Sequence, residues 1–464
     1  MLDAATVFAI PLVSFAGTLL GFCSGLVPGL HMNNVAAALV AYPAFVLGLC
    51  SAISGSAGGD ARGLLVSAFI VGALVGHLFA EAVTSTYVGI PDGDVVSVLP
   101  AHGLARAGLG SLSVKSASEG TMCGILLGAM ILFPACLVMG HPVELYSRID
   151  SLMGFIIVGF SALLICGNAV PIREGMSRPR RYAGSLLASG AVFLSAGLLG
   201  LALFDTDYCS CSLPDFPWVA NEPVRQSALL LPLFAGLFGL PGLILSIGAR
   251  TTEMKQSVKA DMAVPRPTAR EISACVLGGV MVGWLPGMTP GSSAAASAPL
   301  SRAMPEGASV EGAVRFVWAY SAISAMGSVF ALGAFFLLGR TRSGSMDAVG
   351  RFLASAGGAG TLAECAEPML ALVVAALVGG LAGSRLLAIL DRRLAKVQSV
   401  IRSRGASLAS MAFVSILVVA LTGTRGLLLM SAATALGLLT PIAGQRRILL
   451  MGSLLLPIAL DFFA

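Results

Sequence analysis

The sequence GFCSGLVPGLHMNN occupies residues 21–34, and GVMVGWLPGMTPGS occupies residues 279–292. Four positions match when the stretches are aligned without a gap: Gly21 with Gly279, Gly25 with Gly283, Pro28 with Pro286, and Gly29 with Gly287. Each Pro-Gly pair is expected to break a helix, because proline lacks an N–H and glycine is conformationally free. Both copies lie in apolar runs, so the sequence predicts two interrupted membrane helices, one in each half.

The composition is that of a membrane protein. Of 464 residues, 56% are hydrophobic and only 11% are charged, and the mean hydropathy is +0.91. Soluble domains carry about 25% charged residues. At about 20 residues per span, this length predicts an all-α polytopic protein with roughly 12 helical spans plus re-entrant segments. The cell membrane is therefore the expected location. The formal net charge of +5 is too small to indicate nucleic-acid binding.

The polar segments divide the chain into two halves. Residues 250–270 are basic and predict a cytoplasmic linker between a first half, 1–249, and a second half, 271–464. Arginines in 171–181 also indicate the cytoplasmic side, whereas the acidic segment 205–225 should face outward. About seven crossings then separate the two Pro-Gly copies. An odd number makes the halves point in opposite directions, which predicts two inverted repeats.

The broken helices are the expected binding site. A break in the membrane leaves N–H groups that need a partner, and the positive end of a helix attracts anions. Small polar residues after each break add hydrogen-bond donors. The predicted substrate-binding residues are Pro28, Gly29, His31, Asn33 and Asn34 in the first copy and Pro286, Gly287, Thr289, Gly291, Ser292 and Ser293 in the second. A kinked helix at a packing interface is the alternative interpretation.

Two further stretches are candidate parts of the site. Gly89 and Pro91 make a second break, and Asp92 and Asp94 follow it as candidate ligands of a coupling ion, Na⁺ or H⁺. A polar loop at the membrane surface would have the same sequence. Ser321 shares a helix face with Ser324, and these hydroxyls either line a cavity or bond to their own helix.

The sequence contains no pattern typical of a hydrolase or a metal site. It lacks a Gly-x-Ser-x-Gly elbow, a P-loop and a His-Glu-x-x-His helix, and its four histidines are spread over the first third. We therefore expect no catalytic residues, no metal and no cofactor beyond the coupling ion. A membrane enzyme acting on lipid-linked substrates is the competing class, and Asp92 with His102 is its one nearby acid/base pair.

These motifs resemble the large membrane subunit of tripartite tricarboxylate transporters, the TctA-like family. The resemblance is carried by the two Gly-x-x-x-Gly-x-x-Pro-Gly stretches and by Gly89-Ile90-Pro91. It is closest to a stand-alone prokaryotic branch, through residues 31–34 and the run GRTRSG at 339–344. The chain departs from the family where Asp92 follows Pro91, and where a Glu-Ser-x-Asn-Asn-Ala tract is missing from the second half.

The resemblance implies a secondary transporter with elevator-like alternating access, driven by Na⁺ or H⁺. Its implied partners are membrane lipids, a small carboxylate-type anion, a homo-oligomeric copy, a small membrane subunit and a periplasmic-type binding protein. The Pro-Gly stretch with its Ser/Gly tail at 286–293 is also similar to a polyprenyl-phosphate transporter family. A lipid-linked phosphate is therefore the alternative substrate.

Overall fold

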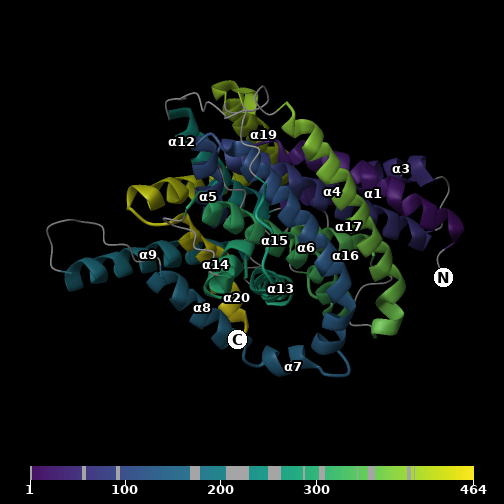
Figure 1. Ribbon diagram of the computed structural model, residues 1–464. Helices are drawn as coiled ribbons and strands as arrows, with labels where there is room; N and C mark the ends of the chain where they lie inside the picture. Colours follow the sequence, from purple (N-terminus) through teal and green to yellow (C-terminus); the bar gives the residue numbers. More distant parts are fainter. Residues whose placement is uncertain are drawn as a thin grey trace.

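The computed structural model describes residues 3–54, 59–89, 95–167, 178–204, 229–248, 263–285, 288–301, 309–341, 343–353, 361–393, 399–401 and 403–463. Within these ranges every regular element is a helix (Figure 1). Eight of the described helices are long and apolar enough to cross a membrane, and a bent pair, Met32–Val40 with Pro43–Ile53, makes up to nine. The helical membrane-protein prediction is confirmed, whereas the count of roughly 12 spans is not.

The two halves repeat one order of helices. The first half contains α1 (Ala4–Gly25), α2 (Met32–Ala41), α3 (Pro43–Ser54), α4 (Gly59–Tyr87), α5 (Val95–Arg106) and α6 (Gly110–Met139). The second half contains α13 (Ala269–Trp284), α14 (Pro290–Ser301), α15 (Val310–Leu338), α16 (Gly344–Phe352) and α17 (Leu362–Asp391). In each half a helix breaks at the motif, a long helix follows, and a short helix precedes the last long one.

The motif glycines let helices within each half approach closely. A Cβ added to Gly21 would clash with the carbonyl of Ala73, and one added to Gly25 would meet the carbonyl of His77 at 2.7 Å. The contacts advance together along both chains, so α1 and α4 run in the same direction. In the second half, Gly279 lies against Met326 and Gly283 against Phe330, so α13 and α15 are parallel in the same way.

The last long helix of each half also packs against the other half. Gly120 and Gly124 of α6 lie against the backbone of Trp318 and Ala322 in α15. Gly379 and Gly383 of α17 lie against Val75 and Phe79 in α4. Glycine at these positions brings the helix backbones together, as is common in membrane bundles. The two halves are thus interlocked rather than side by side.

The direction of the long helices follows from these contacts. The Oγ1 of Thr86, near the end of α4, lies 3.1 Å from the Oγ of Ser113, near the start of α6. Helices α4 and α6 are therefore antiparallel. Because α6 runs parallel to α15, helices α4 and α15 also point in opposite directions. The same holds for α1 and α13, which are parallel to them.

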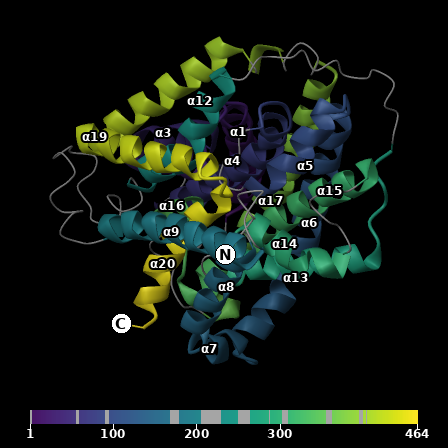
Figure 2. The ribbon, with the colours of Figure 1, turned by 90° about the vertical axis from the view of Figure 1, so that its left-hand side faces the viewer.

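The remaining helices form an outer group. It contains α7 (Leu145–Asp150), α8 (Met153–Gly167), α9 (Arg178–Phe204), the π-helical turn η1 (Ala235–Gly239), α12 (Leu240–Gly248), α19 (Arg404–Ile442), the 3-10 turn η2 (Arg447–Met451) and α20 (Gly452–Asp461). Helix α9 packs on α20, and η1 with α12 packs on α19 (Figure 2). Each contact again joins the two halves. The predicted boundaries at 249 and 271 remain predictions, because most of the linker lies outside the described residues.

Helix α19 is bent sharply at Gly423, which has φ 66° and ψ −163°. Figure 2 shows its two limbs as a V. Each limb is about 28 Å long at about 1.5 Å per residue, close to the thickness of a bilayer core. Each limb is thus long enough to cross a bilayer core, whereas the count of eight treats α19 as a single helix.

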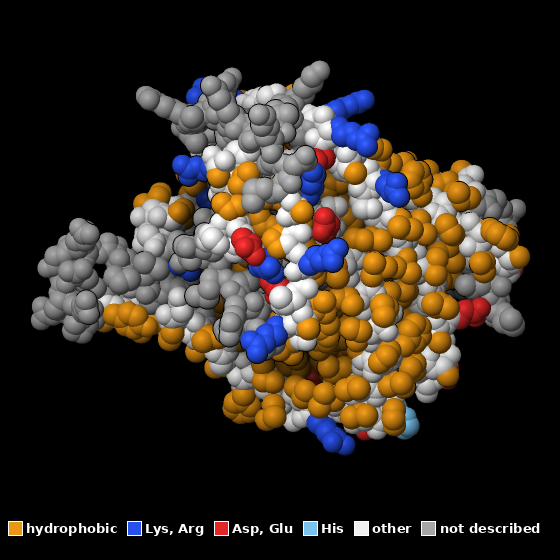
Figure 3. Space-filling view, in the orientation of Figure 1, with side chains coloured by type: hydrophobic (Ala, Val, Ile, Leu, Met, Phe, Trp, Pro, Cys, Tyr) orange, Lys and Arg blue, Asp and Glu red, His pale blue; other side chains and the backbone are white. Residues whose placement is uncertain are grey.

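The outer surface carries large apolar side chains. Phe8, Met130, Leu187 and Ile442 are each more than two-thirds exposed. Figure 3 shows a broad hydrophobic surface over the side where α6 and α17 lie, with charged groups gathered elsewhere. An apolar exterior of this extent is expected where the protein faces lipid.

Candidate functional site

The first Pro-Gly pair breaks a helix as predicted. Helix α1 ends at Gly25, and Gly29 has φ +80°, a left-handed conformation that glycine adopts easily. His31 then caps the next helix, and its Nδ1 accepts the backbone N–H of Asn33 at 3.0 Å. The motif thus ends one helix and begins α2 within a few residues.

The second copy has the same local architecture. Helix α13 ends at Trp284, and Thr289, which aligns with His31, stands immediately before α14. The Oγ1 of Thr289 accepts the N–H of Ser292 at 3.2 Å, while the Thr289 N–H donates to the Ser292 Oγ at 2.9 Å. Pro286 and Gly287 lie outside the described residues, so the break itself is not placed.

The first break lies against a segment that the sequence analysis did not single out. A Cβ on Gly239, in η1, would lie 3.1 Å from the carbonyl oxygen of Gly29. Single π-helical turns of this kind occur frequently at functional sites. The sequence signal was available, because Gly239-Leu-Pro241-Gly242 is a further Pro-Gly pair with a preceding glycine.

The tail of the first motif meets the start of α16. A Cβ placed on Gly344 would lie 3.1 Å from the Cβ of Asn33. We call this contact the α2–α16 junction and define it by Asn33, Asn34, Gly344 and Ser345. A cavity at the junction is lined by Asn33, Asn34 and Gly344, and further along α16 by Asp347 and Arg351.

Two buried polar groups at the junction have no partner. Asn34 is 2% exposed, and its Nδ2 makes no hydrogen bond. Ser345 is fully buried, and its Oγ makes none. A buried polar atom without a partner is costly, and in a functional protein it often marks a place for a ligand or water.

The electrostatics of the junction favour an anion. Helices α2 and α16 both begin here, and a helix N-terminus carries a partial positive charge. The side chains of His31 and Ser343 cap these helices by accepting the N–H groups of Asn33 and Met346. Arg351 adds a cation at the edge of the cavity, although Asp347 accepts from it at 2.8 Å and balances its charge. The junction can therefore hold a negative group mainly through backbone dipoles and the Asn34 amide.

A corresponding junction forms in the second half. Helix α14 packs on α5, as α2 packs on α16. Ser293, in the first turn of α14, is fully buried, and its Oγ has no partner. Gly291 and Ser292 lie beside it in the same turn. The two tails thus occupy equivalent places, each at the start of a short helix that contacts the opposite half.

The break predicted near Gly89 contributes to the junction between α14 and α5. Gly89 has φ +71°, and a Cβ there would lie 3.0 Å from the His102 ring. The Nδ1 of His102 lies 3.1 Å from the carbonyl oxygen of Thr86, which fixes α5 against the end of α4. Pro91, Asp92 and Asp94 lie outside the described residues, and their predicted roles are untested.

The later parts of the short helices α16 and α5 contact opposite ends of α4. The Val349 carbonyl, near the end of α16, lies 3.5 Å from the Ser67 Oγ, close to the start of α4. The end of α5 lies at the opposite end of α4, where His102 meets Thr86. Phe352 of α16 lies against Gly63, nearer the start of α4 than Ser67, so α16 directs its N-terminus toward the middle of α4, the direction expected for an anion site at mid-membrane.

The two broken helices end on either side of this middle level. Gly25 lies against His77 and Ala80, and Gly283 lies against Phe330. Measured along α6 at about 1.5 Å per residue, the end of α1 and the end of α13 are about 15 Å apart. That the Pro-Gly breaks themselves meet stays a prediction, since Pro286 and Gly287 are not described.

Ser321 lies in a separate cavity between α4, α5, α6 and α15. Its neighbours there include Glu81, Thr121 and Ser324. Ser321 and Ser324 both line this cavity, which is distinct from the one at Asn33 and Asn34, and the substrate-binding role of Ser321 stays a prediction.

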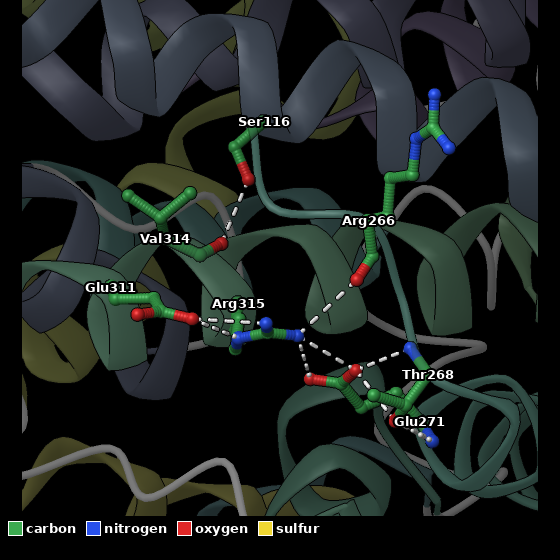
Figure 4. A network of polar contacts seen from close by, with 7 residues as sticks. All are labelled: Ser116, Arg266, Thr268, Glu271, Glu311, Val314 and Arg315. Atoms are coloured by element: carbon green, nitrogen blue, oxygen red, sulfur yellow. Dashed lines mark hydrogen bonds and ion pairs between the residues drawn. The ribbon is translucent and has the colours of Figure 1, made fainter. Parts of the chain in front are cut away.

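A network of polar contacts fixes the start of the second half (Figure 4). Arg315 donates to Glu271 at 2.9 Å and to Glu311 at 3.0 Å. Thr268 and Glu271 form a capping box, and Ser116 of α6 donates to the Val314 carbonyl at 2.8 Å. Burial opposes ionisation of Glu271, but the hydrogen bonds from Thr268 and Arg315 outweigh it and hold its pKa below the ordinary value.

Comparison with known proteins agrees with this architecture. Residues 12–452 match the profile of the Tripartite tricarboxylate transporter TctA family. The chain belongs to this family. It is a multi-pass integral membrane protein of a transporter family, as the resemblance predicted.

A curated relative adds no activity. The chain is 26% identical over 247 residues to the uncharacterized protein MJ1079 of Methanocaldococcus jannaschii. That alignment covers 53% of this TctA-family chain and 50% of the relative, so the chain spans about half the length of the protein it matches. No solved structure matches the chain.

Proposed function

We propose that this TctA-family protein is an ion-coupled secondary transporter of a small carboxylate anion. The observation that carries the proposal is the α2–α16 junction, where two helix N-termini meet beside the unpartnered Asn34 Nδ2 and Ser345 Oγ. Such a site binds a carboxylate without a fixed cation, so the substrate can leave as readily as it enters. His31, Asn33 and Thr289 would hold the two short helices in place through their caps.

The second junction, at α14 and α5, would hold another carboxylate of the same substrate or close over it. Ser293 supplies an unpartnered hydroxyl there. The backbone of the site would be shaped by Pro28 and Gly29, by their counterparts Pro286 and Gly287, and by Gly89 and Pro91. A substrate with two or more carboxylates fits two positively polarised junctions better than a monovalent anion does.

Alternating access is proposed to arise from two inverted repeats. The opposite directions of α4 and α15 and the repeated order of helices support this arrangement. An elevator-like movement would carry the core helices, which hold both junctions, against the outer group of α8, α9, α12, α19 and α20. The contact between Gly29 and Gly239 would be remade during that movement.

The family's description as tripartite suggests additional subunits. We propose a small membrane subunit and a periplasmic-type binding protein as partners, with a second copy of this chain as a further possibility to be tested by the mass of the purified assembly.

The test is uptake by proteoliposomes. Labelled di- and tricarboxylates should accumulate when an inward Na⁺ or H⁺ gradient is imposed, and should not accumulate without it. In parallel, thermal unfolding should shift with the transported anion, because a ligand at 100 times its dissociation constant stabilises by about 2.7 kcal/mol. A shift caused by polyprenyl phosphate alone, with no carboxylate uptake, would assign the chain to lipid-linked phosphate transport instead.

A further inference from the structure

A second polar cavity lies between the halves, away from the α2–α16 junction. Helices α4, α5 and α6 of the first half and α15 of the second half form its walls. Its volume is about 30 Å³, which is enough for a water molecule or a small ion. The oxygen-bearing side chains that line it include Glu81, Ser85, Thr121, Tyr320, Ser321 and Ser324.

Three of the hydroxyl groups that line the cavity make no hydrogen bond to a carbonyl of their own helix. Many hydroxyls on the membrane helices bond to the carbonyl four residues earlier on their own helix, as Thr18 does to the Ser14 carbonyl at 2.8 Å and Ser328 does to the Ser324 carbonyl at 3.0 Å. Within the described residues, the side chains of Thr121, Ser321 and Ser324 make no such bond. Thr121 is only 3% exposed and lines the cavity.

The cavity also contains a carboxylate at membrane depth. Glu81 lies well inside the span Ala61–Tyr87. An acidic group in this position is expensive and usually functional. His77 lies one turn before Glu81 on the same helix.

We propose that this cavity is the binding site of the coupling ion, and that the ion is Na⁺. Glu81 would supply one carboxylate, and Thr121, Ser321 and Ser324 would supply hydroxyl oxygens. Hard cations prefer oxygen ligands, and a single carboxylate balances a single positive charge, which favours a monovalent over a divalent ion. The assignment rests on the proposed transport function and moves the ion site from Asp92 and Asp94 to the interface of the halves.

This location would couple the ion to the substrate. The ion would join α15 of the second half to α4 and α6 of the first. Ala294 of α14 packs in the same cluster as Ala319 and Ala322, which flank Ser321 on α15. Ion binding at Ser321 and Ser324 would therefore fix the part of α15 against which α14 packs. It would thereby order the α14–α5 junction.

The test is direct binding of radioactive Na⁺ to the full-length protein in nanodiscs, measured by scintillation proximity with choline keeping ionic strength constant. Wild-type protein should bind Na⁺ saturably. Glu81→Gln should abolish binding, and Ser324→Ala and Thr121→Val should each weaken it about tenfold or more. Ser328→Ala, on the same helix but bonded to its own backbone, should bind as the wild type does, as should Glu119→Gln on the exposed face of α6.

Each contrary result has a defined meaning. Unchanged Na⁺ affinity in Ser324→Ala and Thr121→Val overturns the proposal even if Glu81→Gln does not fold. Absence of Na⁺ binding by the wild type, with a proton-driven uptake that Glu81→Gln removes, overturns it in favour of H⁺. A tricarboxylate-dependent thermal shift measured on the same samples keeps the proposed function separate, since that shift can persist when Na⁺ binding fails.

Discussion

The Nδ1 of His77 lies 2.9 Å from the Oγ of Ser24, at the point where α1 ends against α4. The same Oγ lies 2.8 Å from the carbonyl oxygen of Gly21, which can only accept. Since a serine hydroxyl has one proton, it donates to Gly21 and accepts the Nδ1–H of His77. This pair fixes the histidine tautomer and ties α1 to α4 just before the Pro28-Gly29 break.

Ser24→Ala should therefore destabilise the protein more than the removal of a serine hydroxyl that bonds only to its own helix. It leaves a buried ring N–H without its acceptor, at a cost of about 1–3 kcal/mol. Thermal unfolding in detergent measures the effect, with Ser384→Ala as the control because that exposed serine bonds to its own helix. Equal melting temperatures for the two variants would mean that the Ser24–His77 contact adds no stability.

The motif glycine Gly21 should tolerate no side chain. A methyl group there would clash with the Ala73 carbonyl and force α1 away from α4, which typically costs about 1–3 kcal/mol or more. Gly48→Ala is the matched control, since no atom lies within 4 Å of its added Cβ. We expect a lower melting temperature for Gly21→Ala and no loss for Gly48→Ala. A neutral Gly21→Ala would contradict the close helix contact.

The local consequences of the motif could be predicted from sequence, because they depend on backbone chemistry. A Pro-Gly pair disfavours the continuation of a helix, and the polar residue two positions after the pair caps the next helix, as His31 and Thr289 do. The role of Gly21 and Gly25 was less visible, because spacing alone does not say which helix they approach.

The partners of each motif could not be predicted, because they depend on how the halves interlock. Asn33 meets Gly344 from the opposite half, and no pattern in residues 21–34 indicates that contact. Gly239 was missed because its Pro-Gly pair lacks the full spacing of the other two copies. Ser321 was found by its helix periodicity, but its cavity with Glu81 requires the packing of α4 against α15.

Asn34→Ala should weaken binding of the transported anion. A hydrogen bond to a charged group is worth about 1.5–3 kcal/mol, so the apparent dissociation constant should rise about 10- to 150-fold. Ser345→Ala should act in the same direction. Substrate-dependent thermal shift and uptake measure both, and Ser384→Ala is again the control. Wild-type affinity in Asn34→Ala and Ser345→Ala would place the substrate elsewhere.

The network at the start of α13 predicts a loss of stability in acid. Glu271 has a depressed pKa in the folded protein, so its contribution is fully present above the unfolded value near 4.5 and is lost as the pH falls through the lower folded value. Glu271→Gln should lower stability at neutral pH by about 1–3 kcal/mol and flatten this acid dependence.

Glu311→Gln is the control for that prediction. Glu311 pairs with the same arginine but is 61% exposed, so its loss should cost little. Unfolding measured at several pH values compares the two variants. If Glu311→Gln were the more harmful change, the exposed contact, and not the capping box, would hold the helices together.

The opposite directions of the two halves predict opposite exposure of two matched residues. Ala4 and Ala269 are the first residues of α1 and α13, and both are exposed. Because these helices are antiparallel, their starts should lie on opposite sides of the membrane, with the start of α13 in the cytoplasm next to the basic linker. In a background without the nine native cysteines, a membrane-impermeant maleimide should label Ala4→Cys in intact cells. It should label Ala269→Cys and Ser309→Cys only after permeabilisation, because α13 and α15 run in parallel. Labelling of Ala4→Cys and Ala269→Cys from the same side would rule out the inverted repeat, whatever the number of spans between them.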